Sequence, residues 1–466
     1  MQNQNEGGFH MKYRALAISD PNQLVFGQAL KPVRSRRGLL IGGGKVFPEL
    51  NFTLPPMEIT DRTFPEVRNQ YRSIVQDALE RAVDLHMEGL VLEFETLLEM
   101  TLRPEWGTEL VAVINEVCEH FYNTYGLKTE IRLTPNDPRD FERPVRMRTS
   151  RYLESMYKLF EEGARAGGTF LSIESTGGKE VCDEALLNCN TAGVVFSLAV
   201  LGVRDMKFLW KNIVEIARRT GTIPGGDTAC GFGNTAMVLA EKKYIPRVFA
   251  AMVRIVSVVR TLVAIEEGAE GPDKDCGYEG PFLKAITGLP ISMEGKTAAC
   301  AHFSPVGNVA AAMADLWSNE SVANTKLLAG MAPTVYLEQL EYDTRLMNKA
   351  LESGSALVLQ NLFVESDIHL DPQALILAPE SVIEISKEIV QGKNPVEAAL
   401  RGAQKGLQII EEDFERGELK MEKREVEWLK RIQEDLAKLP TDEESLVAWI
   451  EPQLDREKVI LSEYGL

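Results

Sequence analysis

The stretch TSRYLESMYKLFEEGARAGGTFLSIES, residues 149–175, contains the repeating unit from which the fold can be predicted. Its first part, 149–167, has apolar residues at helical spacing, which is typical of an amphipathic helix. Its second part, TFLSIES at 169–175, is an apolar run of the length of a buried strand. A helix followed directly by a strand is the building unit of a parallel sheet covered by helices.

The same alternation extends along the chain on both sides of this stretch. A second helical pattern covers 240–260, and an eighth strand is expected near 328–337. The other short apolar runs predicted as strands are GLVLEF from 89, TEIRL from 129, GVVFSLAVLG from 193, GTIPGG from 221, TLVAIEEG from 261 and PISMEG from 290. This order predicts an α/β fold, a (β/α)8 barrel of TIM type, with a doubly wound open sheet as the alternative.

Three regions are predicted from the composition along the chain. Residues 1–60 form a loop-rich N-terminal segment that contains LLIGGGKVFPEL, 61–365 form the barrel, and 366–466 form a C-terminal helical region. The charged run at 410–439 is typical of a solvated helix face. We therefore expect the last region to pack on the barrel as a helical layer.

Charge and hydrophobicity restrict the classes of partner. The chain has 466 residues, 44% of them hydrophobic, and 69 acidic against 51 basic side chains give a net charge of −18, which opposes nucleic-acid binding. The N-terminus has no apolar core of signal-peptide length, and the longest uncharged apolar run, around 193–203, is too short to span a membrane. A cytoplasmic protein is expected. Its six cysteines are then free thiols or metal ligands.

Two glycine clusters fail the patterns of nucleotide-binding loops. GGGK at 42–45 has Leu39 where a P-loop has its first glycine, and Val46 follows the lysine in place of Ser or Thr. GFGN at 231–234 continues without the third glycine of a dinucleotide fingerprint. Neither cluster predicts a phosphate site.

A cysteine in the polar, glycine-punctuated stretch GPDKDCGYEG, 271–280, suggests a thiolate with a chemical task. Cys276 lies in the loop after one predicted strand, Cys230 follows GTIPGGDTA, and Glu174 closes TFLSIES. In a barrel the C-terminal strand ends meet at one face, so these three residues can converge there. Two thiolates and a carboxylate suit zinc with one open position, while two buried thiols and a surface carboxylate are the alternative.

Three other pairs of ligand-type residues are closely spaced: Cys118 with His120, Cys182 with Cys189, and Cys300 with His302. The first pair points to different faces of a helix, and the second shares one helix face, as packing residues do. The third pair could extend from one face of a strand, where a role beside the metal or against the substrate is favoured.

Several longer motifs resemble one known family, the zinc-binding methanol:corrinoid methyltransferase subunit. They are SIESTGGKE at 172–180, GGDTACGFGNTAM at 225–237, GPDKDCGYEGPFLKAITG at 271–288, MEGKTAACAH at 293–302 and LWSNES at 316–321. The similarity follows the same order through roughly 85–350, with fainter likeness at both ends, including VFGQALKPV at 25–33.

The resemblance implies a fold, a metal site and a reaction. The fold is a (β/α)8 barrel with extra helices, and the zinc ligands fall on Glu174, Cys230 and Cys276. The reaction transfers the methyl group of methanol to the Co(I) corrinoid of a partner protein and gives methyl-Co(III) and water, as in methanogenesis or acetogenesis. Because the chain contains no DxHxxG run, the corrinoid is expected on a separate protein that docks at the C-terminal face of the barrel. A homodimer within that complex is expected.

Hydroxide is a poor leaving group, so the reaction needs help at the oxygen. Two thiolates and a carboxylate would leave zinc a weak Lewis acid, and a proton donor is therefore expected nearby. Asp227 and Glu279 are the best candidates, each three residues from a ligand cysteine, or they are structural. Tyr278, Asn234 and His302 are further candidates beside the metal.

Three other functions stay open. Phe232, two residues after Cys230, departs from the polar run expected in the methanol enzymes, which favours as one alternative a methyl donor that is another alcohol, an ether or an amine. The others are a zinc lyase or hydrolase, and a scaffold without catalysis.

Overall fold

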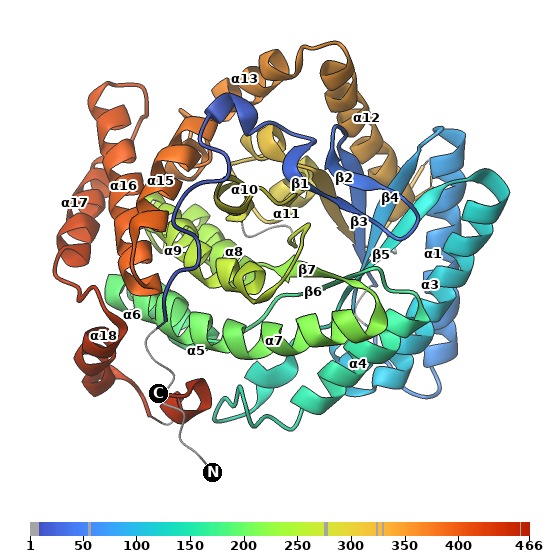
Figure 1. Ribbon diagram of the computed structural model, residues 1–466, viewed down its shortest axis with the longest axis horizontal. Coiled ribbons are helices and arrows are strands. Elements are labelled where there is room, and N and C mark those ends of the chain that lie inside the picture. Colours follow the sequence, from blue (N-terminus) through green and yellow to red (C-terminus); the bar gives the residue numbers. More distant parts are fainter. Residues whose placement is uncertain (1–8, 55–56, 275–277, 323–324, 329, 457) are drawn as a thin grey trace.

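The computed structural model describes residues 9–54, 57–274, 278–322, 325–328, 330–456 and 458–466. Its centre is a curled parallel sheet in which the strands follow the order β7-β6-β5-β4-β3-β9-β8, inside a ring of helices (Figure 1). The strands of this sheet are β3 (Phe47–Thr53), β4 (Gly89–Glu95), β5 (Lys128–Thr134), β6 (Phe170–Ile173), β7 (Ile223–Asp227), β8 (Ser292–Glu294) and β9 (Leu316–Val322).

An irregular segment, 270–274, occupies the eighth position between β7 and β8. The amide of Glu270 donates to the Pro224 carbonyl at 2.8 Å, and that of Gly271 donates to the Gly225 carbonyl at 2.9 Å. On the other side, Asp273 accepts a hydrogen bond from the Ser292 amide at 3.0 Å. The segment therefore links both edges of the sheet, and the fold is the predicted (β/α)8 barrel of TIM type.

Helices surround the strands in the order that the alternation predicted. They are α1 (Phe64–Asp84), α2 (Leu98–Leu102), α3 (Pro104–Tyr125), α4 (Leu153–Ala166), α5 (Lys179–Leu187), α6 (Thr191–Phe196), α7 (Val203–Thr220), α8 (Cys230–Glu241), α9 (Arg247–Glu267), α10 (Gly280–Thr287), α11 (Lys296–Ala301) and α12 (Ala332–Glu352). The prediction of a helix at 149–167 followed by a strand is confirmed by α4 and β6.

Three predicted strands are wrong. The run at 193–202 forms the end of α6 and a π-helical turn, η3 (Ser197–Gly202), the run at 261–268 ends α9, and α12 begins at Ala332 inside the expected eighth strand. Residues 193–202 and 261–264 are all buried, so these stretches have no exposed polar face and lack the helical period by which an amphipathic helix is recognised.

Two strands of the barrel sheet were missed. β3 lies within the segment predicted to be loop-rich. β9 contains LWSNES, whose polar residues interrupt the apolar pattern by which a strand is recognised. The polar residues Ser318, Asn319 and Ser321 of β9 are nevertheless buried. The division into three regions stays a prediction.

A β-hairpin closes the N-terminal end of the barrel. It consists of β1 (Gln28–Arg34) and β2 (Leu40–Gly43), and a second small hairpin at the other end consists of β10 (Lys326–Leu327) and β11 (Gly330–Met331). An apolar cluster joins the first hairpin to the starts of the strands: Val33, Leu39, Ile41, Phe47, Val91, Phe170 and Leu316. The C-terminal strand ends are thus the ones available for a site.

The C-terminal region forms a helical layer, as predicted. Its helices are α13 (Ala356–Asp367), α14 (Pro372–Leu375), α15 (Pro379–Gln391), α16 (Pro395–Glu415), α17 (Lys423–Leu436) and α18 (Glu443–Ile450). α16 packs closely on α9, since a Cβ at Gly406 would lie 2.1 Å from Cδ1 of Ile255. Of the described helices, α9 alone is long and apolar enough to cross a membrane, and 94% of its most apolar window is buried inside the protein.

A buried ion pair ties the barrel together from within. Arg132 of β5 donates to the carboxylate of Glu49 on β3, and both side chains have no exposed surface. The same guanidinium donates to Ser172 of β6 at 2.8 Å and to the Pro272 carbonyl of the irregular segment at 2.9 Å. Ser292 of β8 completes the network by donating to Glu49. Five of the eight barrel positions therefore meet at this pair.

Replacing Arg132 by Met should lower the free energy of unfolding by about 3–5 kcal/mol, because the Glu49 carboxylate would stay buried without its partner. The double change Arg132→Met with Glu49→Leu should cost much less, since no charge is then left unpaired. Arg68→Met is the control: its pair with Glu109 is half exposed, and its loss should cost under about 1 kcal/mol. Denaturant unfolding measures all three, and equal losses for the two single variants would contradict the role of Arg132.

Candidate active site

Polar side chains gather where the barrel strands end. The residues at these ends are Asn51 on β3, Glu93 and Glu95 on β4, Thr134 on β5, Glu174 after β6, Cys230 after β7, Lys274 in the irregular segment, Glu294 on β8 and Glu320 on β9. Because the strands are parallel, their C-terminal ends all lie at the same mouth of the barrel. Residues from all seven strands of the sheet and from the irregular segment can thus act at one site.

Lys274 connects two of the carboxylates. Its ammonium nitrogen lies 3.0 Å from Oε1 of Glu174 and 3.1 Å from Oε1 of Glu93. The lysine and Glu93 are buried, whereas the Glu174 side chain keeps 29% of its surface exposed. Glu174 is therefore held by a buried cation on one side and is open to the mouth on the other.

Cys230 is the first residue of α8, where the helix dipole favours negative charge on the sulfur. Asn234, one turn later, donates its side-chain amide to Sγ of Cys230 at 3.2 Å. Asn234, predicted from sequence to lie beside the metal, therefore contacts one predicted ligand. Cys276, the third predicted ligand, lies outside the described residues.

Glu174 shares a pocket with the start of α8. The pocket has a volume of about 150 Å³ and contains Glu95, Asn136, Phe141, Glu174, Lys179 and Gly231, among others, in its wall. Gly231 directly follows Cys230, so the pocket that Glu174 borders lies next to the residue after the predicted thiolate ligand. Phe232 does not line the pocket; it is buried, with its ring 4.8 Å from the guanidinium of Arg260.

Glu95 is a site residue that the sequence analysis missed. Burial, together with the nearby carboxylates of Glu174 and Glu320, raises the pKa of Glu95 to about 7, although Lys274 and the hydrogen bond from the Asn51 amide act in the opposite direction. A carboxyl group with this pKa can give up a proton near neutral pH. The signal in the sequence was an acidic pair, EFE, at the end of a buried strand.

His302 lies between two carboxylates at the same mouth. Its Nδ1 contacts Glu294, and its Nε2 lies 3.1 Å from Glu320. These hydrogen bonds, first that of Glu294, raise the pKa of His302 to about 10, so the imidazole is positively charged at neutral pH. His302 directly follows the short helix α11, which corrects the prediction that it shares a strand face with Cys300.

Tyr278 extends this chain of contacts inward. The buried tyrosine donates its hydroxyl to Glu294, and the Arg254 guanidinium lies 4.4 Å from the centre of its ring. Burial, together with the Glu294 charge, raises the pKa of Tyr278 well above its ordinary range. Its phenol therefore stays protonated, and Tyr278, Glu294, His302 and Glu320 form one hydrogen-bonded row.

Asp227 is fully occupied by structural hydrogen bonds. One oxygen accepts from the Trp210 indole at 2.8 Å, and the other accepts from the amides of Thr228 at 2.9 Å and Ser175 at 3.3 Å. Arg260 lies 3.4 Å from the same oxygen. Asp227 thus holds the loop after β6 against the end of β7, and it is not directed at the pocket.

Glu279 holds the loop that leads to Cys230. Its Oε1 accepts from the Ala229 amide at 2.5 Å and from the Thr261 hydroxyl at 2.8 Å. Burial raises the pKa of Glu279. Ala229 directly precedes Cys230. Glu279, which was predicted as a proton donor, therefore holds the loop that leads to this predicted ligand.

The remaining cysteine and histidine pairs lie away from the pocket. Cys118 is buried and His120 exposed on α3, and Cys182 is buried on α5 while Cys189 lies beyond the end of that helix, which corrects their predicted shared face. Among the described residues, one further group of metal-ligand type lies close together: His369, Asp413 and Glu418. Arg416 bridges both of its carboxylates and neutralises part of their charge.

The donors at the mouth fit a zinc ion. Zinc prefers thiolate, imidazole and carboxylate ligands, and a catalytic site keeps one position open. Glu174 and Cys230 provide one carboxylate and one thiolate beside a pocket, and the partial exposure of both leaves room for a small ligand.

Comparisons with known proteins show the family to which the chain belongs. The family model of the methanol-cobalamin methyltransferase B subunit, MtaB, matches residues 10–465. The methanol–corrinoid protein co-methyltransferase of Methanosarcina barkeri is 36% identical over 435 residues, which cover 92% of this chain and 94% of the relative. The crystal structure of the methanol:cobalamin methyltransferase complex MtaBC from Methanosarcina barkeri contains a chain with a TM-score of 0.94 and 35% identity, covering 97% of this chain and 99% of that one. Matched in sequence and fold over nearly its whole length, this chain belongs to the methanol-cobalamin methyltransferase B subunit family and is a methyltransferase.

Proposed function

We propose that this chain transfers the methyl group of methanol to the Co(I) corrinoid of a partner protein, with a zinc ion held by Glu174, Cys230 and Cys276. The observation that carries the proposal is the shared pocket of Glu174 and the start of α8 at the barrel mouth. Family membership supports the reaction. A volume of about 150 Å³ suits a substrate as small as methanol.

The reaction breaks the C–O bond of methanol and forms a carbon–cobalt bond. Co(I) supplies the electron pair for the new bond and becomes Co(III), while the oxygen leaves with the C–O electron pair and takes up a proton to give water. Zinc would supply Lewis-acid polarisation of the alcohol oxygen. The residues of the chain must bind methanol, exclude water and provide the proton.

Glu95 is our candidate for the proton donor. It borders the same pocket as Glu174, and its carboxyl group is protonated in a substantial fraction of molecules at neutral pH. The charged groups around it are Lys274 of the irregular segment, Glu174 after β6 and Glu320 of β9, with the Asn51 amide of β3 at 3.1 Å. Buried Lys274 keeps the total negative charge of this group low.

The row of Tyr278, Glu294, His302 and Glu320 would supply protons for the reaction beside Glu95. His302 carries a positive charge near Glu320, whose carboxylate contributes to the raised pKa of Glu95. Its imidazole is partly exposed, so a proton from solvent can reach this row. We therefore assign His302 to proton supply, and Tyr278 and Asn234 to the positioning of the site.

The partner that carries the corrinoid would dock on the barrel mouth. Large apolar side chains are exposed there, with relative exposures of 58% for Phe141, 57% for Phe303 and 111% for Leu328. Phe141 also borders the pocket, so a protein bound to these side chains would lie directly over Glu174. The crystal structure of the Methanosarcina barkeri relative is a complex, MtaBC.

A second copy of the chain would cover a different surface. Leu346 of α12 and Val358 and Leu362 of α13 are each more than half exposed and form an apolar face on the outer helices. This face supports the homodimer that was predicted. A cytoplasmic location is proposed with it, because corrinoid chemistry on Co(I) and free thiols both need a reducing compartment.

Purified protein should contain about one zinc per chain, and Cys230→Ala should remove most of it because a thiolate ligand is lost. Glu174→Gln should reduce zinc affinity and methyl transfer severely while the thermal unfolding midpoint stays nearly unchanged, since a barrel of this size does not depend on a metal for folding. Metal analysis and the spectral change from Co(I) to methyl-Co(III) measure both effects. Cys300→Ala, at an exposed cysteine, is the control that should keep its zinc. Full zinc in Cys230→Ala would refute the site.

Methyl transfer should slow as the pH rises through about 7 if Glu95 supplies the proton, because the protonated fraction of a carboxyl group falls above its pKa. A bound metal cation would move this fall in rate, the alkaline limb of the pH profile, to lower pH, since positive charge favours the carboxylate form of Glu95. Glu95→Gln should be slower by roughly 10²-fold and should lose this limb of the pH profile. Glu116→Gln, on the exposed face of α3, should keep the wild-type profile. An unchanged limb in Glu95→Gln would exclude Glu95 as the donor.

Phe141→Ser and Leu328→Ser should each weaken binding of the corrinoid protein by about tenfold, because each exposes the partner's apolar surface to water. Tyr125→Ser is the matched control: it is 57% exposed, but it ends α3 at the opposite end of the barrel. Binding can be measured by calorimetry with the purified corrinoid protein. Equal weakening by all three variants would argue against docking at the mouth.

A further inference from the structure

The loop that carries Glu174 is held by side chains from three other parts of the chain. The Ser175 amide donates to Asp227 at 3.3 Å, the Thr176 amide donates to Asp137 at 3.0 Å, and the Gly178 amide donates to the hydroxyl of Tyr464 at 3.1 Å. Asp227 and Asp137 belong to the neighbouring strand ends of the barrel. Tyr464 comes from a segment 286 residues away in sequence.

The far end of this loop, 174–178, consists of two glycines, so no side chain of its own fixes it there; Thr176, before them, donates its hydroxyl to Asp137 at 3.1 Å. A Cβ at Gly177 would lie 2.3 Å from Cβ of Asp205, and one at Gly178 would lie 2.4 Å from the Ser197 carbonyl. Gly178 also has a φ of +85°, which other residues rarely adopt. The loop is therefore positioned by hydrogen bonds to its backbone from outside.

The segment with Tyr464, residues 458–466, is itself firmly attached. Glu463 accepts from the amides of Arg148 at 2.8 Å and Thr149 at 2.9 Å, and Arg204 donates to the Gly465 carbonyl at 2.8 Å. Although burial acts in the opposite direction, these hydrogen bonds lower the pKa of Glu463, so its carboxylate stays charged. Burial keeps the phenol of Tyr464 protonated by raising its pKa.

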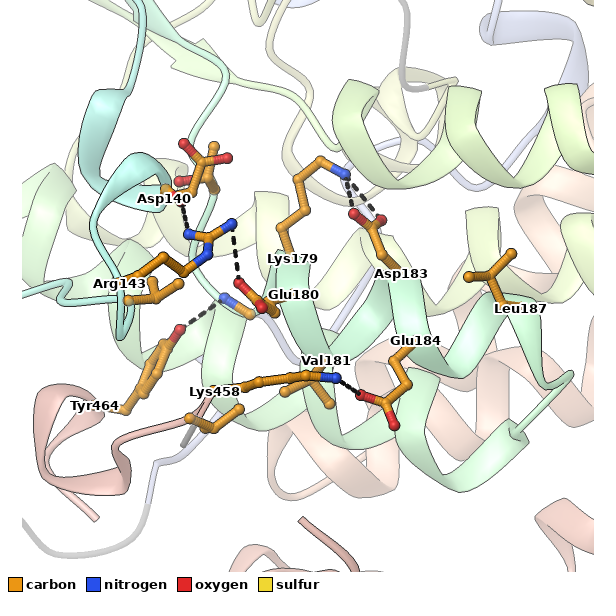
Figure 2. A pocket seen from close by; sticks show the side chains of 14 residues that line it. Asp140, Arg143, Lys179, Glu180, Val181, Asp183, Glu184, Leu187, Lys458 and Tyr464 are labelled. Carbon is orange, nitrogen blue, oxygen red and sulfur yellow. Dashed lines mark hydrogen bonds and ion pairs between the residues drawn. The ribbon is translucent and has the colours of Figure 1, made fainter. Parts of the chain in front are cut away.

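Figure 2 shows this segment from the side of α5. The Tyr464 hydroxyl points toward the start of the helix, and Lys458 reaches Glu184 on the same helix at 3.2 Å. Together, 458–466 and α5 border a pocket of about 360 Å³ whose wall includes Thr176 and Lys179, which also line the pocket of Glu174. The segment thus contacts the Glu174 loop on the side away from the barrel axis.

We propose that Tyr464 is a positioning residue for Glu174: its hydroxyl fixes the Gly178 amide and thereby sets where the Glu174 carboxylate stands at the barrel mouth. The inference rests on the proposed role of Glu174 as a metal ligand. A residue almost at the far end of the chain then determines how well the site binds its metal, without touching metal or substrate.

The test is Tyr464→Phe in the full chain, which removes the hydroxyl and keeps the ring. In metal-free protein, hydrogen exchange at the Gly178 amide should become about tenfold faster, since the amide loses its acceptor. Zinc affinity, measured by competition with a chromophoric chelator, should fall by roughly three- to tenfold. The thermal unfolding midpoint should stay close to that of the wild type.

Two further variants make the result decisive. Tyr122→Phe, at a partly exposed tyrosine of α3, should change neither readout, and Glu463→Gln should change both in the direction of Tyr464→Phe. Faster exchange with unchanged zinc affinity, or no change in exchange, would overturn the proposal. Wild-type protein without zinc would instead refute the metal site, while the exchange measurement would still report whether Tyr464 holds the loop.

Discussion

The ion pair between Arg132 and Glu49 inside the barrel is the interaction on which the rest of the site depends. A charged pair without exposed surface is stable only when its remaining hydrogen-bonding groups are satisfied. Here Ser172, Ser292 and the Pro272 carbonyl provide these partners. The hydrogen bond to the Pro272 carbonyl matters most, because the segment at 270–274 has no strand geometry of its own and ends at Lys274. The buried pair thus turns an irregular segment into the eighth wall of the barrel.

Charge at the mouth follows from the same arrangement. Three strand ends contribute four carboxylates, Glu93, Glu95, Glu294 and Glu320, which repel one another unless cations lie among them. Lys274 forms ion pairs with Glu93 and Glu174, while His302 forms ion pairs with Glu294 and Glu320. Glu95 has no ion pair among the described residues, and burial raises its pKa to about 7. The mouth therefore contains a carboxyl group that can release a proton near neutral pH.

The outer layers leave one end of the barrel for chemistry. The hairpin of β1 and β2 fills the N-terminal end with apolar side chains, and the C-terminal helices cover α9, so neither surface has a comparable concentration of polar groups. The segment at 458–466 returns from the helical layer to the loop of Glu174. The C-terminal region, which is far from Glu174 in sequence, therefore contacts the loop that carries Glu174.

The sequence by itself determined the alternating order of helices and strands, the barrel class and the C-terminal helical layer, and it suggested candidate metal ligands. The first three depend on local periodicity, and the last on residue types that zinc prefers. Local patterns failed where burial is complete: 193–202 and 261–268 are helical although they read as strands, and β3 and β9 were missed. Only the tertiary structure decided that Asp227 and Glu279 are structural, that Glu95 and Lys274 belong to the site, and that Tyr464 reaches the Glu174 loop. The physical reason is that a pKa or a hydrogen bond depends on which distant side chains become neighbours, and no periodicity along the chain records that.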